Sequence, residues 1–339
     1  MTDSHSEPID TWLYPTSKGL YCAAGGFYID PPGAVERAII THGHSDHARS
    51  GHRYVLSTIE TMEIMKVRLG KEAAGSFQSL RYGEPLTIGE TQVCLAPAGH
   101  VIGSAQVVIQ HRGKRAVVSG DYKRSRDPTC APFEVVSCDV FVTEATFGLP
   151  VFRHEPAERE IQRLLASIQV AADRAHLVGV YGLGKCQRVI ALLREPGYDK
   201  PIWLHGALIA MCDAYRSFGI DLGPLSPASD TTCSLAGEII LCPPSALKDR
   251  WSRRMTDTVV ALASGWMRVR ARARQRGVEL PLIISDHADW PELLQTIQDT
   301  AAEEVWVTHG REDALLHQIK LMGKCGRGLS LVGREDETD

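Results

Sequence analysis

Potential metal ligands are concentrated in one short segment, residues 41–52, which reads THGHSDHARSGH. An H-x-H-x-D-H pattern within it consists of His42, His44, Asp46 and His47. Two histidines at i and i+2 can point the same way from a loop, and the Asp-His pair that follows can face a neighbouring point. Imidazole and carboxylate together suit zinc, manganese or iron. The spacing therefore predicts ligands for two adjacent cations, with His52 outside the pattern in a structural role.

Three further ligand candidates follow β-branched segments elsewhere in the chain. His100 comes after LAPAG, Asp121 after AVVSG, and His309 after EVWVT. Polar residues that follow several strands can converge on one site, so we expect these three side chains to complete the metal centre.

The elements that must position these residues form an α/β pattern. Strands are expected at RAIITHG, DVFVTEATFG and EEVWVTHG, and a hairpin at AQVVIQHRGKRAVVSGD turns around residues 112–114. Apolar residues at helical spacing predict a helix over 158–174, with shorter helices over 185–193 and 208–218. Between residues 178 and 263 strands alternate with helices, which is typical of a parallel sheet.

Composition narrows the possible classes of protein. The net charge of the 339 residues is −4, so any contact with nucleic acid must come from local basic segments. The nine cysteines include no C-x-x-C pair, which argues against a disulfide framework and favours a reducing compartment. The sequence has no signal-peptide pattern and no apolar run of about 18 residues. We therefore expect a cytoplasmic protein that does not contact a membrane.

The ligand motifs together resemble a known family. H-x-H-x-D-H, a lone histidine and an aspartate in SGD look like the metallo-β-lactamase fold, an αββα sandwich. Past VTEATFG the chain runs through the α/β segment and resumes at SDHADW, a layout similar to that of the β-CASP nucleases. Their α/β cap is inserted into the sandwich. The resemblance implies a metallo-β-lactamase domain in two parts, residues 1–149 and 266–339, with a cap at 150–265.

Local stretches narrow the resemblance further. GDYKRSRDPT, ASGWMRVR and SDHADW look most like the bacterial DNA exonucleases associated with ATP-dependent ligases, relatives of Artemis and the crosslink-repair nucleases. YGLGKCQRV looks like the strand-to-helix segment of the family that carries Gly-Arg/Lys-x-Gln.

The resemblance also assigns the ligands to two divalent metal ions, with zinc favoured over manganese or iron. One metal takes His42, His44 and His100, the other takes Asp46, His47 and His309, and Asp121 bridges them. Two metals about 3.5–4 Å apart can share a hydroxide that attacks a phosphodiester, so Asp46 and Asp121 would also serve catalysis.

Three more residues receive roles from the same resemblance. His287 in SDHAD matches a general acid that protonates the leaving oxygen, and Glu144 in TEATFG would orient its ring. Asp30, after GGFYI, would brace the ligand loop from outside the metal site.

Basic residues indicate where nucleic acid could bind. In RVRARARQR, arginine stands at every second position, so in an extended segment these side chains would point to one side and match a phosphate backbone. The other candidates follow Asp121, stand at a predicted helix start, or offer a backbone N–H. The full set of candidates is Lys123, Arg124, Lys185, Arg188, Ser264, Arg268, Arg270, Arg272 and Arg274.

The expected function is that of a metal-dependent DNA exonuclease in DNA repair. Its substrate would be single-stranded DNA or DNA with a free end, and the resemblance implies functional association with an ATP-dependent DNA ligase and a helicase. The main alternative is an RNA-processing exo- or endonuclease of the RNase J or polyadenylation-factor kind, because RNA-acting relatives carry histidine where this chain has His309. The inserted cap disfavours a small-molecule hydrolase, and the complete ligand set disfavours an inactive scaffold.

Overall fold

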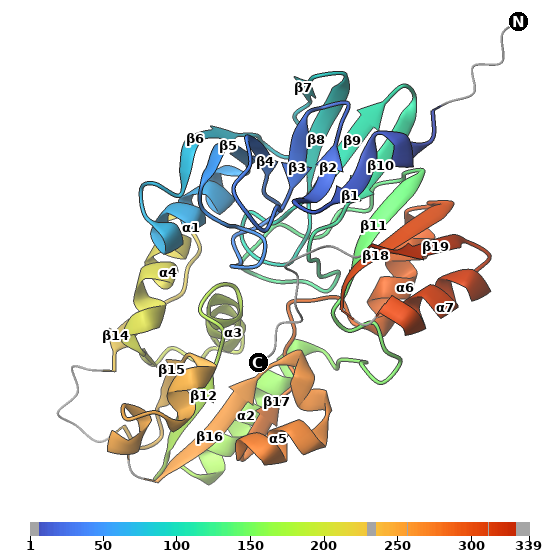
Figure 1. Cartoon of the computed structure of the whole chain (residues 1–339). Helices are drawn as coiled ribbons and strands as arrows, with labels where there is room; N and C mark the ends of the chain where they lie inside the picture. The colour runs from blue at the N-terminus through green and yellow to red at the C-terminus, as the bar shows by residue number, and fades with distance from the viewer. Residues whose placement is uncertain (1–6, 229–234, 256, 311, 330–339) are drawn as a thin grey trace, which may run out of the picture. The chain divides into compact units, whose positions relative to one another are not determined.

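The computed structural model describes residues 7–228, 235–255, 257–310 and 312–329 (Figure 1). Its internal contacts divide the chain into two units. One unit contains the residues up to Val151 and those from His287 onward, and the other runs from Phe152 to Asp286. The second unit is thus inserted into the sequence of the first. In the described part of the chain, no helix has the length and apolar character needed to cross a bilayer.

Two sheets form the centre of the first unit. The first has the order β1-β2-β3-β4-β5-β6 and consists of β1 (Leu13–Thr16), β2 (Gly19–Cys22), β3 (Phe27–Ile29), β4 (Arg37–Ile39), β5 (His52–Ser57) and β6 (Ala74–Ser79). The second has the order β19-β18-β11-β10-β9-β8-β7 and consists of β7 (Leu86–Ile88), β8 (Thr91–Pro97), β9 (Ala105–His111), β10 (Lys114–Val118), β11 (Val140–Ala145), β18 (Glu304–Gly310) and β19 (Cys325–Gly328).

Three helices cover the outer faces of these sheets: α1 (Ile59–Leu69), α6 (Trp290–Asp299) and α7 (Glu312–Leu321). Apolar side chains of both sheets, such as Phe27 and Val107, share a buried core. Met65 of α1 belongs to a second cluster on the first sheet, and Leu293 and Leu315 belong to a third on the second sheet. This helix–sheet–sheet–helix order confirms the predicted αββα sandwich (Figure 1).

The second unit is an α/β domain built on one parallel sheet, as the alternating pattern predicted. Its strand order is β14-β13-β15-β12-β16-β17, with β12 (Ala175–Gly179), β13 (Ile202–Leu204), β14 (Leu225–Pro227), β15 (Ile239–Cys242), β16 (Thr258–Ala263) and β17 (Leu280–Leu282). Its α-helices are α2 (Ala157–Val170), α3 (Lys185–Arg194), α4 (Gly206–Ser217) and α5 (Arg270–Arg276). Short 3-10 helices include η2 (Pro244–Lys248) and η4 (Gly265–Arg268).

The end of the second unit differs from the boundary expected at residue 265. β17 pairs in parallel with β16, with Leu282 opposite Ala263. β17 therefore completes the sheet of the second unit, residues 266–286 belong to that unit, and the first unit resumes at His287.

Candidate metal and catalytic site

The ligand loop follows β4 and is held in place by a buried carboxylate. Asp30, just after β3, accepts the backbone N–H of Thr41 at 2.8 Å and its hydroxyl at 2.6 Å. Its Oδ2 also lies 2.7 Å from Nδ1 of His47. A partner on one ring nitrogen fixes the orientation of the ring and directs the other nitrogen into the site. Asp30 thus contacts both ends of the segment that carries the H-x-H-x-D-H pattern.

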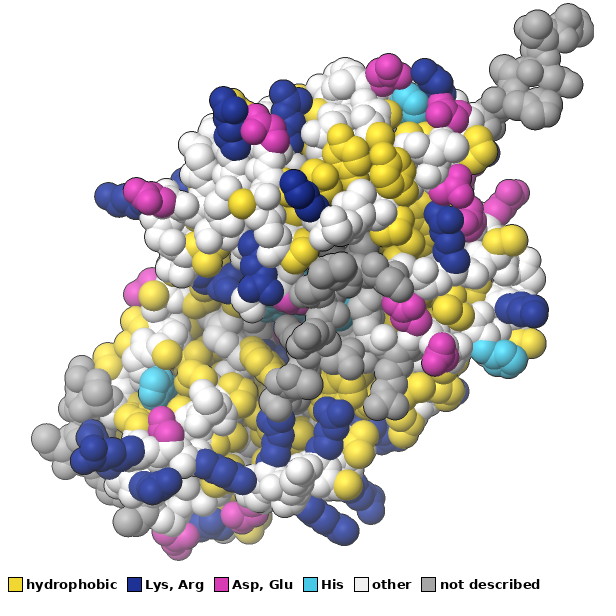
Figure 2. Space-filling view, viewed as in Figure 1, with side chains coloured by type: hydrophobic (Ala, Val, Ile, Leu, Met, Phe, Trp, Pro, Cys, Tyr) yellow, Lys and Arg dark blue, Asp and Glu magenta, His cyan; other side chains and the backbone are white. Residues whose placement is uncertain are grey.

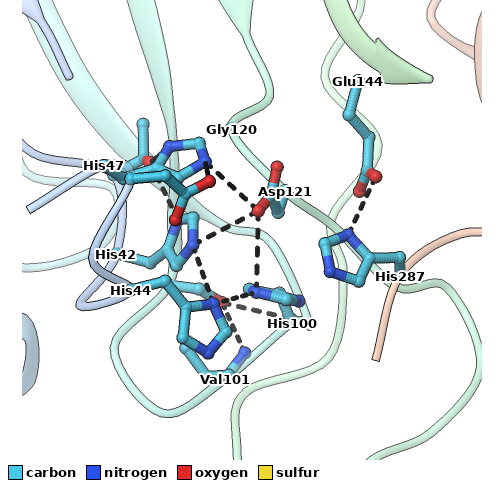
Figure 3. Close-up of polar contacts among 12 residues, drawn as sticks. His42, His44, His47, His100, Val101, Gly120, Asp121, Glu144 and His287 are labelled. Carbon is cyan, nitrogen blue, oxygen red and sulfur yellow. Dashed lines mark hydrogen bonds and ion pairs between the residues drawn. The ribbon is translucent and has the colours of Figure 1, made fainter. Parts of the chain in front are cut away.

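One group of potential ligands combines three histidines with an aspartate. The ligand atoms of His42, His44, His100 and Asp121 all lie within 4.8 Å of one another. Nδ1 of His44 is 3.1 Å from Nε2 of His42 and 2.9 Å from Nε2 of His100. Figure 3 shows the rings of these three residues beside the carboxylate of Asp121. The loop after β4 supplies two members of the group, and the loops after β8 and β10 supply the others.

A second group shares the same aspartate. The ligand atoms of Asp46, His47, Asp121 and His309 also lie within 4.8 Å of one another. Nε2 of His47 is 3.3 Å from Asp46 Oδ2 and 3.2 Å from Asp121 Oδ2. His309 stands near the end of β18, with its Nδ1 3.7 Å from Asp121 Oδ1. Asp121 is therefore the residue that the two groups share.

The polar atoms that converge here fit divalent metal ions. Among the described residues, several buried atoms make no hydrogen bond beyond the ion-pair contacts given above, namely Asp46 Oδ2, His47 Nε2, both carboxylate oxygens of Asp121 and His309 Nδ1. Buried polar atoms without partners are costly unless something else binds them. Nitrogen and carboxylate oxygen are the donors that zinc, iron and manganese accept. The two groups are thus metal-binding clusters in composition and geometry.

Burial and neighbouring charges also favour metal binding. Burial, with help from His47, lowers the pKa of His42 to about 4. Burial likewise lowers the pKa of His100, and the neighbouring His287 lowers it further. Burial alone would raise the pKa of Asp121, but His47 and His42 hold it well below its ordinary value. Unprotonated imidazoles around an ionised carboxylate are in the protonation states that metal binding requires.

The pKa of His47 is shifted in the opposite direction from those of His42 and His100. Burial would lower its pKa, but the carboxylates of Asp121, Asp46 and Asp30 together raise it well above the ordinary value. Without a metal, this ring therefore carries a proton that partly balances the three acids. A cation bound between the carboxylates would replace that proton.

A buried acid–histidine pair lies beside the first group. Nδ1 of His287 is 2.9 Å from Oε2 of Glu144, near the end of β11. Oε1 of Glu144 accepts the backbone N–H of Tyr122 at 2.7 Å, directly after Asp121. The ring centroid of His287 lies 4.6 Å from that of His100. Figure 3 shows His287 with one nitrogen directed toward Glu144. This position allows proton transfer next to the clusters.

The pair is also close enough to Asp121 to form a further potential ligand group. Ligand atoms of Asp121, Glu144 and His287 lie within 4.8 Å of one another. Because Nδ1 of His287 is already bonded to Glu144, a metal role would have to use the other ring nitrogen. Proton transfer and metal binding can therefore be separated by the metal content of a His287 variant.

Two site residues have unusual backbone conformations. Asp30 has φ of 43° and His309 has φ of 62°, a left-handed region that non-glycine residues rarely occupy. Such conformations persist where the surrounding structure imposes them, and they are frequent at functional sites. Both residues follow or end buried strands, so the strain lies where the chain turns toward the clusters.

The arginine-rich segment is helical, and the predicted extended line was wrong. Residues from Arg270 form α5, in which side chains two positions apart point in nearly opposite directions. Arg270 and Arg274 share one exposed face, whereas Arg272 is half-buried, with its guanidinium 4.1 Å from the centroid of Trp266. Arg268, in η4, is exposed. Figure 2 shows Lys and Arg side chains on the surface of the second unit.

Four other basic candidates differ from the expectation because they bond to the protein itself. Lys185 and Arg188 of α3 are each only 2% exposed. Lys185 Nζ donates to Asp286 Oδ1 at 2.6 Å, and Arg188 donates to the carbonyl of Ser285. Lys123 and Arg124 donate to carboxylates of α6.

Ser264 is also buried and acts as a cap for the helix that follows it. Its hydroxyl accepts the backbone N–H of Trp266 at 3.3 Å, at the start of η4. Its backbone N–H, the expected phosphate donor, donates to the carbonyl of Leu282 at 3.0 Å, so Ser264 differs from the expected phosphate contact.

Sequence reasoning missed Glu292, which bonds the segment after Asp121 to α6. The capping box that begins α6 offered a partial signal, since Asp289 and Glu292 are spaced as its two members. That motif predicts a helix start, but it gives no indication of a partner in the distant segment after Asp121.

No protein-family model matches the chain. The chain is 27% identical over 302 residues to a probable DNA ligase of Opitutus terrae, a match that covers 88% of this chain and 29% of that protein. It is 30% identical over 226 residues to endoribonuclease YSH1 of Gibberella zeae, which covers 55% of this chain and 26% of that one. The chain thus spans less than a third of the length of either relative.

A solved structure shares the fold. The crystal structure of a protein of unknown function from Enterococcus faecalis superimposes with a TM-score of 0.54 at 16% identity, over 88% of this chain and 80% of that one. At this identity the likeness concerns the fold alone.

Proposed function

We propose that this chain, which belongs to the β-CASP family of metallo-β-lactamase-fold proteins, is a metal-dependent DNA exonuclease. The observation that carries the proposal is the shared Asp121, which joins the two ligand groups next to the Glu144–His287 pair. Two cation sites and a proton donor within one buried cluster are the parts that phosphodiester hydrolysis requires. We assign the second unit as the β-CASP cap.

The residues of the site divide the reaction among them. Two divalent cations, zinc first among them, would supply Lewis-acid activation of water and of the scissile phosphate when bound. His42, His44 and His100 would hold one cation, Asp46, His47 and His309 would hold the other, and Asp121 would be shared by the two groups. Asp30 keeps the ring of His47 turned toward the site.

Proton transfer to the leaving oxygen is assigned to His287. Its Nδ1 is engaged by Glu144, so the other ring nitrogen is the one that can give up a proton to substrate. The buried carboxylate of Glu144 orients the ring and stabilises its positive charge. Glu144 also accepts the backbone N–H of Tyr122, next to Asp121. It therefore connects His287, the proposed proton donor, to the ligand group.

Binding of the substrate backbone is assigned to exposed arginines of the second unit. Arg268, Arg270 and Arg274 are exposed, and no acidic residue lies between positions 258 and 278 of the sequence. Guanidinium groups on such a surface suit contacts with phosphates, which give affinity without base specificity.

The preference for DNA is supported by the relative named as a probable DNA ligase. Nearly the whole of this chain is similar to a segment of that protein. A nuclease segment within a protein named for joining DNA would suit the trimming of ends before they are joined. We therefore propose a role in DNA repair, on single strands or free ends, in functional association with an ATP-dependent ligase.

RNA processing is the second candidate. The relative from Gibberella zeae is named an endoribonuclease, and His309 fits the histidine found in RNA-acting relatives. The fold and the clusters are compatible with either sugar, because phosphodiester chemistry at the phosphorus atom is the same in both.

Digestion of single-stranded DNA and RNA of one sequence, each labelled at either the 5′ or the 3′ end, tests the proposal. Protein freed of metal by a chelator is restored with zinc, manganese or iron, and His287→Ala serves as the matched control. We expect progressive shortening of DNA that depends on metal and is strongly reduced in the variant. Cleavage of RNA alone would favour the second candidate, and cleavage of neither would reject a nuclease.

A further inference from the structure

Lys123 stands two residues after Asp121, and its side chain pairs with a residue of α6. Its ammonium donates to Oε2 of Glu292 at 2.6 Å, across 169 positions of sequence. Only 4% of Lys123 is exposed, and the Glu292 side chain is mostly buried. Burial would raise the pKa of Glu292, but the ammonium of Lys123 lowers it, so the carboxylate stays ionised at neutral pH. The pair is therefore a shielded ion pair within the first unit.

Glu292 connects two segments of the site through its remaining contacts. Its Oε1 accepts the backbone N–H of Ser125 at 2.8 Å, and its Oε2 accepts that of Asp289 at 3.1 Å. Asp289 lies two residues after His287, at the start of α6. One carboxylate thus binds the segment that begins at Asp121 and the segment that carries His287.

Backbone bonds join the same segments closer to the reacting groups. The N–H of Ala288, next to His287, donates to the carbonyl of Tyr122 at 2.6 Å. The N–H of Lys123 donates to the carbonyl of Ala98 at 3.0 Å, two residues before His100. A Cβ on Gly99, which has φ of +73°, would lie 2.2 Å from the Lys123 carbonyl. The segments that carry His100, Asp121 and His287 therefore meet around Lys123.

We propose that Lys123 and Glu292 are positioning residues that fix His287 relative to Asp121. This inference rests on the proposed function, and it replaces the expected role of Lys123 as a contact for nucleic acid. In this role the pair acts through the two segments that it joins. Its effect is geometric, since a displacement of about 1 Å in a catalytic group can cost a factor of 10² in rate.

The helix offers a matched control at its other end. Arg124 donates to Asp299 Oδ2 at 2.7 Å and to Thr296 Oγ1 at 3.3 Å. This ion pair joins the same two segments, but Asp299 is the last residue of α6 and His287 precedes the first. Asp299→Asn therefore removes an ion pair between the same two segments, but it leaves the contacts at the start of α6, next to His287, in place.

The experiment compares Glu292→Gln with Asp299→Asn on two substrates. A DNA oligonucleotide has a leaving oxygen that needs a proton, whereas bis(p-nitrophenyl) phosphate releases a phenolate that does not. We expect Glu292→Gln to lower kcat on DNA about 10-fold or more, with KM and metal content nearly unchanged, and to have little effect on the activated ester. Asp299→Asn should keep the wild-type ratio of the two rates.

Several outcomes decide the matter. Equal losses on both substrates, or a wild-type ratio in Glu292→Gln, would overturn the positioning role. If Glu292→Gln does not fold, Lys123→Met and Lys123→Arg provide the same test. The arginine variant keeps the charge and should keep the wild-type ratio of the rates on the two substrates. The methionine variant should lower the rate on DNA relative to that on the activated ester. A wild-type protein that cleaves neither substrate would instead reject the proposed function and would be recognised before any variant is compared.

Discussion

Removal of the His287 ring is the perturbation that most clearly separates proton transfer from metal binding. His287 lies beside His100 and bonds to Glu144 through Nδ1, but each of the two main ligand groups is complete without it. His287→Ala should therefore keep both metals and still bind substrate. A general acid contributes about 10²–10⁴ in rate. At 1.36 kcal/mol for each factor of ten, we expect a loss of about 3–5 kcal/mol of transition-state stabilisation.

The assay measures kcat on a DNA oligonucleotide and on bis(p-nitrophenyl) phosphate, together with metal content by elemental analysis. The deficit should shrink on the activated ester, because its leaving group needs no proton. Glu144→Gln keeps the shape of the contact to His287 Nδ1 and should give a smaller deficit of the same kind. His309→Ala is the matched comparison, with lower metal occupancy and similar losses on both substrates. Loss of metal from His287→Ala, or an equal deficit on both substrates, would refute the assignment.

Three further results are expected. Asp121→Ala should lose metal and activity together, because the carboxylate belongs to both ligand groups. Elemental analysis that finds two metals in a variant that is still active would contradict this prediction. Replacing Arg268, Arg270 and Arg274 with alanine should flatten the salt dependence of single-strand binding by about 2 units of log–log slope, at about 0.7 per lost phosphate contact; an unchanged slope would mean that these arginines do not contact the substrate. Since Lys123 holds the pKa of Glu292 below its ordinary value of 4.5, the stabilisation from this pair should be complete above about pH 5 and disappear as the pH falls through the folded-state pKa. The difference in Tm between wild type and Glu292→Gln should therefore shrink in acid, and a difference that is constant with pH would contradict the ion pair.

The ligand groups could be predicted because their signals are local. His42, His44, Asp46 and His47 lie within six residues, and His309 ends an apolar segment. Parallel pairing of β11 with β18 then brings His309 to the same edge of the sheet as the earlier ligands. The positions of these residues at strand ends were therefore enough to predict that ligands far apart in the sequence converge on one site.

The basic residues include one helix signal that the sequence did contain and one ion pair that it could not reveal. Alternating Arg and Ala fits an extended segment, but both are strong helix formers, and Gly277, with φ of 66°, ends α5 as a left-handed cap. That signal was present in the sequence and favoured a helix. The bond of Lys123 to Glu292 has no such signal, since it depends on how α6 packs in the first unit. Pairing of β17 with β16, which moves the boundary of the second unit, is equally a tertiary contact.

Activity titrated with metal tests the central claim most directly. Protein freed of metal is mixed with increasing equivalents of zinc or manganese, and the rate of single-stranded DNA hydrolysis is followed at each step. We predict no hydrolysis without metal and a rate that reaches its plateau at two equivalents per chain, because Asp121 is shared by two potential ligand groups. Full activity in the presence of chelator, or no activity at any metal content, would contradict the account.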